Sequence, residues 1–318
     1  MPIYNTIIEN IKGRHINLLS SNKYAYFKKN MLVKNEHFQS IDIQTETFPD
    51  GEHHWILQNV SKIKGKPAVY VCGTIDDEAI FELYNIASTL VREQCSSLHL
   101  VLPYFGYSTM ERATTEGEVV TAKNIAKMLS SLPLSPEGNF IYMVDLHSFG
   151  TQYYFEDSLH PVHLSAKNVV KRMISDCGSD VVLASADMGR AKWIEKLGDE
   201  LKLQTAFIMK RRLDGIHTNV EALNADVNGK NVVIFDDMIR SGSSIIKAAE
   251  AYKSVGAKDV YVAVVHGVFT PQSIEKMQNS DLIKQILVTN SHPNALKYQS
   301  EFIRVYDISQ VISEGLVL

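Results

Sequence analysis

Residues 231–257 read NVVIFDDMIRSGSSIIKAAEAYKSVGA. In this stretch a short apolar run, 232–235, is followed by two acidic residues, a loop of small polar residues and an amphipathic helical pattern. A strand that is apolar on both faces is typical of a parallel sheet covered by helices on each side. Ligands of such sheets bind just beyond the carboxyl ends of the strands. The stretch therefore predicts an α/β fold with a ligand site at this loop.

The loop after the strand has the chemistry of a phosphate cradle. Backbone N–H groups and hydroxyls at the start of a helix converge on one point, and the helix dipole favours an anion there. Asp236 and Asp237 precede the loop, and carboxylates only accept hydrogen bonds, so a sugar's hydroxyls or a metal must separate them from a phosphate. The alternative, simple capping of strand and helix, is disfavoured by the buried strand and long helix on either side. The predicted cradle comprises Ser241, Gly242, Ser243 and Ser244.

The same alternation of apolar strands and longer helical patterns extends over most of the chain. It predicts two tandem α/β units, at residues 1–156 and 157–318, divided at the polar stretch EDSLHP of 156–161. Strands are expected at 68–72, 98–102, 140–145, 181–184, 205–208, 232–235, 260–265 and 285–288. Helices are expected at 78–91, 119–129, 165–174, 190–201 and 241–255.

The composition of the chain limits the classes of partner that it is expected to bind. The 318 residues are 45% hydrophobic and 21% charged, with a net charge of -4, which does not supply the basic field of a nucleic-acid or membrane-surface binder. Three widely spaced cysteines without a CxxC pair predict neither disulfides nor a zinc site. No signal-peptide pattern and no apolar run of about 20 residues is found, so a soluble cytoplasmic protein is expected.

Residues 231–257, with their two acids and the serine-rich loop, resemble the signature of proteins that make or use phosphoribosyl diphosphate. Five further segments resemble elements of one family of these proteins, the ribose-phosphate diphosphokinases. The five segments are FPDGE (48–52), LPYFGY (102–107), DLH (145–147), HGVF (266–269) and TN (289–290). A phosphoribosyltransferase with a single such domain would leave the first half of the chain unexplained. The chain is identified as a divergent member of the diphosphokinase family.

The resemblance implies a fold and an activity. The fold would be two phosphoribosyltransferase-like domains in tandem, each a mostly parallel sheet flanked by helices. The activity would be magnesium-dependent transfer of diphosphate from ATP to the 1-hydroxyl of ribose 5-phosphate, giving phosphoribosyl pyrophosphate and AMP. A homo-oligomer, dimer or hexamer, is implied as well, with the Phe48–Glu52 segment reaching toward a neighbouring subunit's adenine.

Roles of individual residues follow from the same resemblance. Lys210 and Arg212 resemble the first and third positions of a basic loop that stabilises the transition state, where phosphoryl transfer needs positive charge. A solvated basic turn is the competing interpretation. The residues implied for ATP binding are Phe48, Asp50, Glu52, Arg112 and His147. Those implied for ribose phosphate binding are Asp187, Asp236, Asp237, Arg240, Ser241, Gly242, Ser243 and Ser244.

His147 and Asp187 are the implied magnesium residues. Magnesium prefers oxygen ligands, so the Asp187 carboxylate would bind the ion, and His147 would act through water or on a phosphate oxygen. A purely structural histidine is the alternative for His147.

The chain departs from the family at several positions. Thr109 stands where relatives place an arginine against the nucleotide, and loop 113–118 (ATTEGE) is acidic where many relatives are basic. Arg112 or Arg190 could supply the missing charge. Arg190 replaces a glycine of the family's Pro-Asp-x-Gly-Gly, and Arg240 replaces an aspartate. Two alternatives remain open at this point: the same transfer to a larger acceptor such as ADP-ribose, and a non-catalytic regulatory homologue.

Overall fold

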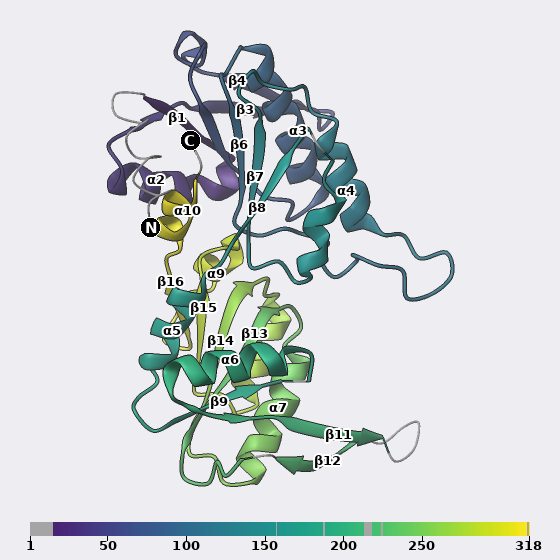
Figure 1. Ribbon diagram of the computed structural model, residues 1–318, viewed down its shortest axis with the longest axis vertical. Coiled ribbons are helices and arrows are strands. Elements are labelled where there is room, and N and C mark those ends of the chain that lie inside the picture. The colour runs from purple at the N-terminus through teal and green to yellow at the C-terminus, as the bar shows by residue number, and fades with distance from the viewer. Residues whose placement is uncertain (1–14, 157, 187, 213–217, 224, 317) are drawn as a thin grey trace. The chain divides into compact units, whose positions relative to one another are not determined.

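The computed structural model describes residues 15–156, 158–186, 188–212, 218–223, 225–316 and 318. The chain divides into two compact units (Figure 1). The first runs to Ser165 and also contains Ser309–Leu318, and the second is Ala166–Ile308. Each unit has a six-stranded sheet whose neighbouring strands all run parallel. The predicted α/β class with two mostly parallel sheets is confirmed.

The first unit is built on a sheet of order β2-β1-β5-β6-β7-β8. The strands are β1 (Ile16–Ser20), β2 (Phe38–Ser40), β5 (Ala68–Val71), β6 (Leu98–Leu102), β7 (Asn139–Val144) and β8 (His160–Leu164). The helices are α2 (Ala25–Lys34), α3 (Asp77–Arg92), α4 (Thr121–Ser130) and α10 (Ser309–Gly315). Helices α3 and α4 lie on one side of the sheet and α2 and α10 on the other (Figure 1). A two-stranded antiparallel hairpin, β3 (Ile43–Thr47) and β4 (His53–Leu57), projects from this unit.

The second unit repeats the plan with the order β10-β9-β13-β14-β15-β16. Its strands are β9 (Val181–Ser185), β10 (Gln204–Ala206), β13 (Asn231–Ile239), β14 (Val260–Gly267), β15 (Gln285–Thr289) and β16 (Ile303–Tyr306). Its helices are α5 (Lys167–Ser175), α6 (Ala191–Leu201), α7 (Ser243–Ser254), α8 (Pro271–Asn279) and α9 (Pro293–Lys297). A second hairpin joins β11 (Ile208–Arg212) to β12 (Thr218–Leu223).

The division between the units differs from the expected boundary at 156/157. β8 pairs in parallel with β7, from Phe140↔His160 to Val144↔Leu164, so the first sheet continues past the polar stretch. The last ten residues also belong to the first unit, where Lys34 donates a hydrogen bond to the Ser309 hydroxyl at 3.0 Å. The second unit is therefore inserted before a short C-terminal helix of the first.

β13 is longer than its apolar run. The strand was expected to end with this run, at Phe235. Pairing with β14 instead continues through Asp236↔Val264 to Ile239↔Gly267. Both acidic residues thus lie inside the strand, and α7 begins at Ser243 instead of at Ser241. Two-sided burial explains the strand, since Val232, Val233 and Ile234 are fully buried.

Across the described part of the chain, no helix combines the length and hydrophobicity that a membrane span requires.

Candidate active site

The end of β13 places the two acidic residues on opposite faces of the second sheet. Successive side chains of a strand alternate between faces. Asp237 follows Phe235 on the face covered by α6, and it is only 5% exposed. Asp236 is half-buried on the other face, and its carboxylate accepts a hydrogen bond from the backbone N–H of Asp237 at 2.9 Å. The two carboxylates therefore lie in different surroundings and do not form one acidic pair.

Asp237 is paired with Arg190. The guanidinium Nη2 lies 2.8 Å from Asp237 Oδ1, and the Asp237 side chain is 7% exposed. The arginine precedes α6, and three residues further on Trp193 stacks on Phe235 with ring centroids 4.0 Å apart. From the sequence, Arg190 was expected only as a possible replacement for the positive charge missing at Thr109. Its position beside Asp237 was not predicted.

The predicted cradle forms the turn from β13 into α7. Gly242 has φ +73°, a left-handed conformation that glycine adopts without steric cost. A Cβ there would lie 2.7 Å from Met277 Sδ on α8, so the turn packs closely against that helix. The Ser243 N–H and the Ser241 hydroxyl lie 3.5 Å apart. Ser241, Ser244 and Arg240 are exposed, and Gly242 is buried.

A lysine outside the predicted site reaches the cradle. Lys276 on α8 donates from Nζ to the Ser243 hydroxyl at 3.1 Å. This cation stands beside backbone N–H groups at the start of a twelve-residue helix, an arrangement that favours an anion. Nothing in the sequence around Lys276 marked it, because its proximity depends on how α8 packs on the loop.

The predicted catalytic residues lie on the second hairpin. Lys210 and Arg212 are in β11, where Lys210 pairs with Val220 and Arg212 with Thr218 of β12. Both residues lie within a strand and not in the loop that the sequence had suggested. Asp187, predicted to bind magnesium and ribose phosphate, lies outside the described residues. In the parts of the chain that are described, no group of three or more His, Cys, Asp or Glu residues could hold a metal ion.

The predicted nucleotide-binding segment is the turn of the first hairpin. Phe48 N–H donates to the Glu52 carbonyl at 2.8 Å, and the Asp50 carboxylate accepts from the Glu52 N–H at 3.1 Å. Phe48 is 40% exposed and stacks on His54 with ring centroids 5.5 Å apart. Asp50 and Glu52 are exposed as well. The turn therefore exposes an aromatic ring and two carboxylates.

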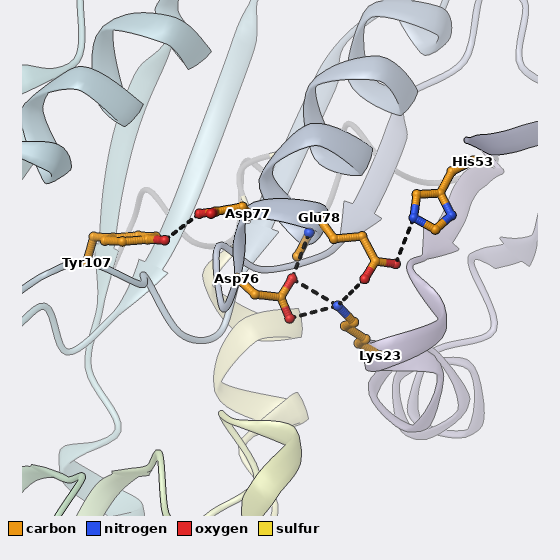
Figure 2. Close-up of polar contacts among 7 residues, drawn as sticks. Lys23, His53, Asp76, Asp77, Glu78 and Tyr107 are labelled. Carbon is orange, nitrogen blue, oxygen red and sulfur yellow. Dashed lines mark hydrogen bonds and ion pairs between the residues drawn. The ribbon is translucent and has the colours of Figure 1, made fainter. Parts of the chain in front are cut away.

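A polar network ties this hairpin to the start of α3 (Figure 2). His53 Nε2 lies 3.6 Å from Glu78 Oε1, and Lys23 Nζ lies 3.4 Å from the other oxygen of Glu78. Lys23 also bonds Asp76 at 2.8 Å, and Asp76 caps α3 by accepting from the Ala79 N–H at 2.9 Å. The hairpin base is thus held by charges at a helix N-terminus, where acidic side chains are stabilised by the dipole.

The strand exit 102–107 reaches the same helix. Tyr107, in a left-handed conformation with φ +57°, donates its hydroxyl to the Asp77 carboxylate (Figure 2). That hydrogen bond raises the pKa of Tyr107. Gly106 donates to the Thr74 hydroxyl at 2.6 Å, and a Cβ on Gly106 would lie 1.8 Å from the Thr74 carbonyl oxygen. Only glycine fits this close approach of two chain segments.

The remaining ATP candidates also lie in the first unit. His147 is half-buried just after β7, and the neighbouring Leu146 N–H donates to His163 Nε2 at 3.3 Å. Burial lowers the pKa of His163, which keeps that ring able to accept the hydrogen bond. Arg112 has a side chain that is 78% exposed and lies 3.7 Å from the Glu111 carboxylate.

In the acidic loop 113–118, the carboxylate of Glu118 accepts hydrogen bonds from other residues of the loop. Glu118 accepts from the Thr114 N–H at 2.6 Å, the Thr114 hydroxyl at 2.7 Å and the Thr115 N–H at 3.2 Å. Hydrogen bonds from Thr114, and then from Thr115, lower the pKa of Glu118. Donors that could face a phosphate are therefore engaged by Glu118.

The structure brings Asp236, Asp237, Arg240 and the cradle together at one end of β13. Open α/β sheets bind their ligands in this place, beyond the carboxyl ends of the strands. The N-terminal domain of ribose phosphate pyrophosphokinase matches residues 16–132, and the phosphoribosyl synthetase-associated domain matches residues 217–317.

Known proteins are similar to this chain over most of its length. The ribose-phosphate pyrophosphokinase of Pyrococcus furiosus is 30% identical over 254 residues, covering 79% of this chain and 86% of its own length. That of Mycoplasma pneumoniae is 31% identical over 281 residues, covering 85% and 82%. The crystal structure of phosphoribosylpyrophosphate synthetase from Mycobacterium smegmatis superimposes with a TM-score of 0.81 at 22% identity, covering 94% of this chain and 97% of that chain. The chain belongs to the ribose-phosphate pyrophosphokinase family.

Proposed function

We propose that this protein transfers the diphosphoryl group of ATP to the 1-hydroxyl of ribose 5-phosphate, releasing AMP and phosphoribosyl pyrophosphate. The observation that carries this proposal is the cradle at 241–244 placed beside Asp237 at the end of β13. The relatives that match most of the chain are named for the same activity. Neither a larger acceptor nor a non-catalytic role is favoured by them.

The second unit supplies the acceptor site. The N–H groups at the start of α7 and the hydroxyls of Ser241, Ser243 and Ser244 bind the 5-phosphate. Asp237 accepts hydrogen bonds from ring hydroxyls, since a carboxylate accepts several. Asp236 and exposed Arg240 line the approach to the cradle.

ATP binds through residues of the first unit. Phe48 offers a ring face for the adenine, and Asp50 and Glu52 accept hydrogen bonds from base or sugar. His147 and Arg112 serve the phosphates, and Arg112 takes the role that Thr109 cannot fill.

The chemical step is an in-line displacement. A bond forms between the ribose 1-oxygen and the β-phosphorus of ATP, and the 1-hydroxyl loses its proton to solvent. The bond from that phosphorus to the oxygen bridging to the α-phosphorus breaks, and AMP leaves. Lys210 and Arg212 stabilise the charge that builds up on the phosphorus oxygens.

Magnesium is the proposed metal cofactor. It keeps water molecules and substrate phosphates among its ligands, so a protein cage of three or more side chains is not required of it. The Asp187 carboxylate would hold the ion, with His147 acting through water or on a phosphate oxygen. The bound ion would supply charge neutralisation on the ATP phosphates.

An acceptor screen tests the proposed function. The protein is incubated with ATP, magnesium and, separately, ribose 5-phosphate, ribose and ADP-ribose, and AMP is followed by chromatography. We expect AMP with ribose 5-phosphate and little with the other two acceptors. Equal AMP release from ribose and ribose 5-phosphate would contradict the assigned role of the cradle.

Lys276→Ala is expected to raise the KM for ribose 5-phosphate about 5-fold and leave the KM for ATP unchanged. The ammonium lies beside the cradle, but a surface charge contact is worth only about 1 kcal/mol. The ratio of the two KM values should shrink as salt is added. Lys247→Ala on α7, which removes the same charge from another exposed position, is the control. A loss shared equally by ATP would contradict this role for Lys276.

We also propose that the protein acts as a homo-oligomer. The exposed turn 48–52 presents its ring and carboxylates outward, which suits a nucleotide bound by a neighbouring subunit. Activity per chain should therefore fall when dilution separates the subunits. Light scattering and assays over the same concentration range check this, and full activity in a monomer would rule it out.

A further inference from the structure

We infer that Arg190 is a positioning residue for ribose 5-phosphate, which acts by fixing the carboxylate of Asp237. This inference rests on the proposed function, in which Asp237 accepts hydrogen bonds from the ring hydroxyls of the acceptor.

The pair is built into the contact between α6 and β13. Arg190 and Trp193 are three residues apart at the start of the helix, so they project from one face of it. Phe235 and Asp237 are two residues apart in the strand and share a face of the sheet. The helix face meets the strand face at two points: Trp193 stacks on Phe235 at 4.0 Å and 16°, and Arg190 Nη2 lies 2.8 Å from Asp237 Oδ1.

The two contacts leave Asp237 little freedom. The aromatic stack fixes the start of α6 against the strand, and the guanidinium holds one carboxylate oxygen. A carboxylate accepts several hydrogen bonds, so the side chain that Arg190 orients can also accept one from a hydroxyl. The side chain of Asp237 is 7% exposed, so its charge is screened little by water and depends on a cation nearby.

Arg190 thus has a stabilising and an orienting effect on one group. Without the arginine, a largely buried carboxylate would lose this cation and the contact that orients it. A hydroxyl of ribose 5-phosphate would then meet an acceptor that must first be ordered. The loss should fall on acceptor binding and not on ATP, because the residues proposed to bind ATP lie in the other unit.

The first test compares Arg190→Ala, Arg190→Lys and the parent protein. We expect Arg190→Ala to raise the KM for ribose 5-phosphate at least 10-fold, with the KM for ATP within about 2-fold, since a lost bond to a charged partner costs about 1.5–3 kcal/mol. Arg190→Lys keeps a point charge without the planar fork and should recover part of the loss. Added guanidinium ion at millimolar concentration should partly restore Arg190→Ala. Lys196→Ala, on the exposed side of α6, is the matched control for charge and should behave as the parent.

A double-mutant cycle separates positioning from direct contact. If Arg190 works through Asp237, then Arg190→Ala should cause no further loss in an Asp237→Asn background. Losses that multiply would overturn the inference and assign Arg190 a contact of its own. An Arg190→Ala protein with parental KM values would also overturn it.

Failure of this inference can be told from failure of the proposed function. A parent protein that releases no AMP with ribose 5-phosphate contradicts the function. In that event, calorimetric titration measures the affinity of the parent and of the Arg190 variants for ribose 5-phosphate. These affinities test the positioning role without the reaction. Thermal unfolding of each variant identifies any that do not fold, and Arg190→Lys then carries the test.

Discussion

Replacing Lys210 or Arg212 by alanine is expected to lower kcat at least about 100-fold, while the KM values for both substrates change only a few-fold. Removal of one preorganised donor from a reaction centre costs roughly 100- to 1,000-fold in turnover. The effect falls on kcat because these groups meet charge that exists only in the transition state. Steady-state kinetics with each substrate varied at saturation of the other measure both constants.

Arg211→Ala is the control for this prediction. It removes the same charge from the position between the two candidates on β11, where Arg211 pairs with Asn219 of β12. We expect its kcat within a few-fold of the parent. If all three variants lose activity equally, the hairpin carries a diffuse basic field and the assignment of the first and third positions is wrong.

Asp237→Ala is expected to weaken ribose 5-phosphate binding by roughly 10- to 150-fold and leave ATP binding nearly intact. The change removes an acceptor that ring hydroxyls use, which costs about 1.5–3 kcal/mol for a charged partner. It also leaves the guanidinium of Arg190 without the carboxylate 2.8 Å away. Calorimetric titration with ribose 5-phosphate and with a non-hydrolysable ATP analogue measures the two affinities separately.

The Asp237 experiment also has a defined contradictory result. Equal losses for sugar and nucleotide would mean that the carboxylate supports the fold and does not select the acceptor. Asp226→Ala, which removes an exposed carboxylate near the start of the same strand, provides the comparison for net charge.

The sequence predicted the interior strands of both sheets, except β1, because burial on both faces leaves a simple apolar pattern. β5, β6, β9 and β15 are mostly apolar, and their positions were expected almost to the residue. β8 was missed because its sequence, HPVHL, contains two histidines and a proline at the sheet edge. β13 was expected to end at Phe235, but main-chain pairing with β14 carries it on through both acidic residues.

The site was predictable to the extent that its residues are neighbours in sequence. The cradle and its glycine follow from local helix-start chemistry, and the left-handed Gly242 agrees with it. Arg190 and Lys276 could not be assigned from the sequence. Their partners Asp237 and Ser243 are 47 and 33 residues away, and only the packing of α6 and α8 brings them close.

The central claim is transfer of a diphosphoryl group, and the most direct measurement is phosphorus NMR of a reaction of ATP, ribose 5-phosphate and magnesium with the protein. The account predicts that AMP appears together with two coupled phosphorus signals of a diphosphate on the sugar, beside the unchanged 5-phosphate, in equal amounts. Appearance of ADP with a single new phosphate on the sugar, or no consumption of ATP at all, would contradict it.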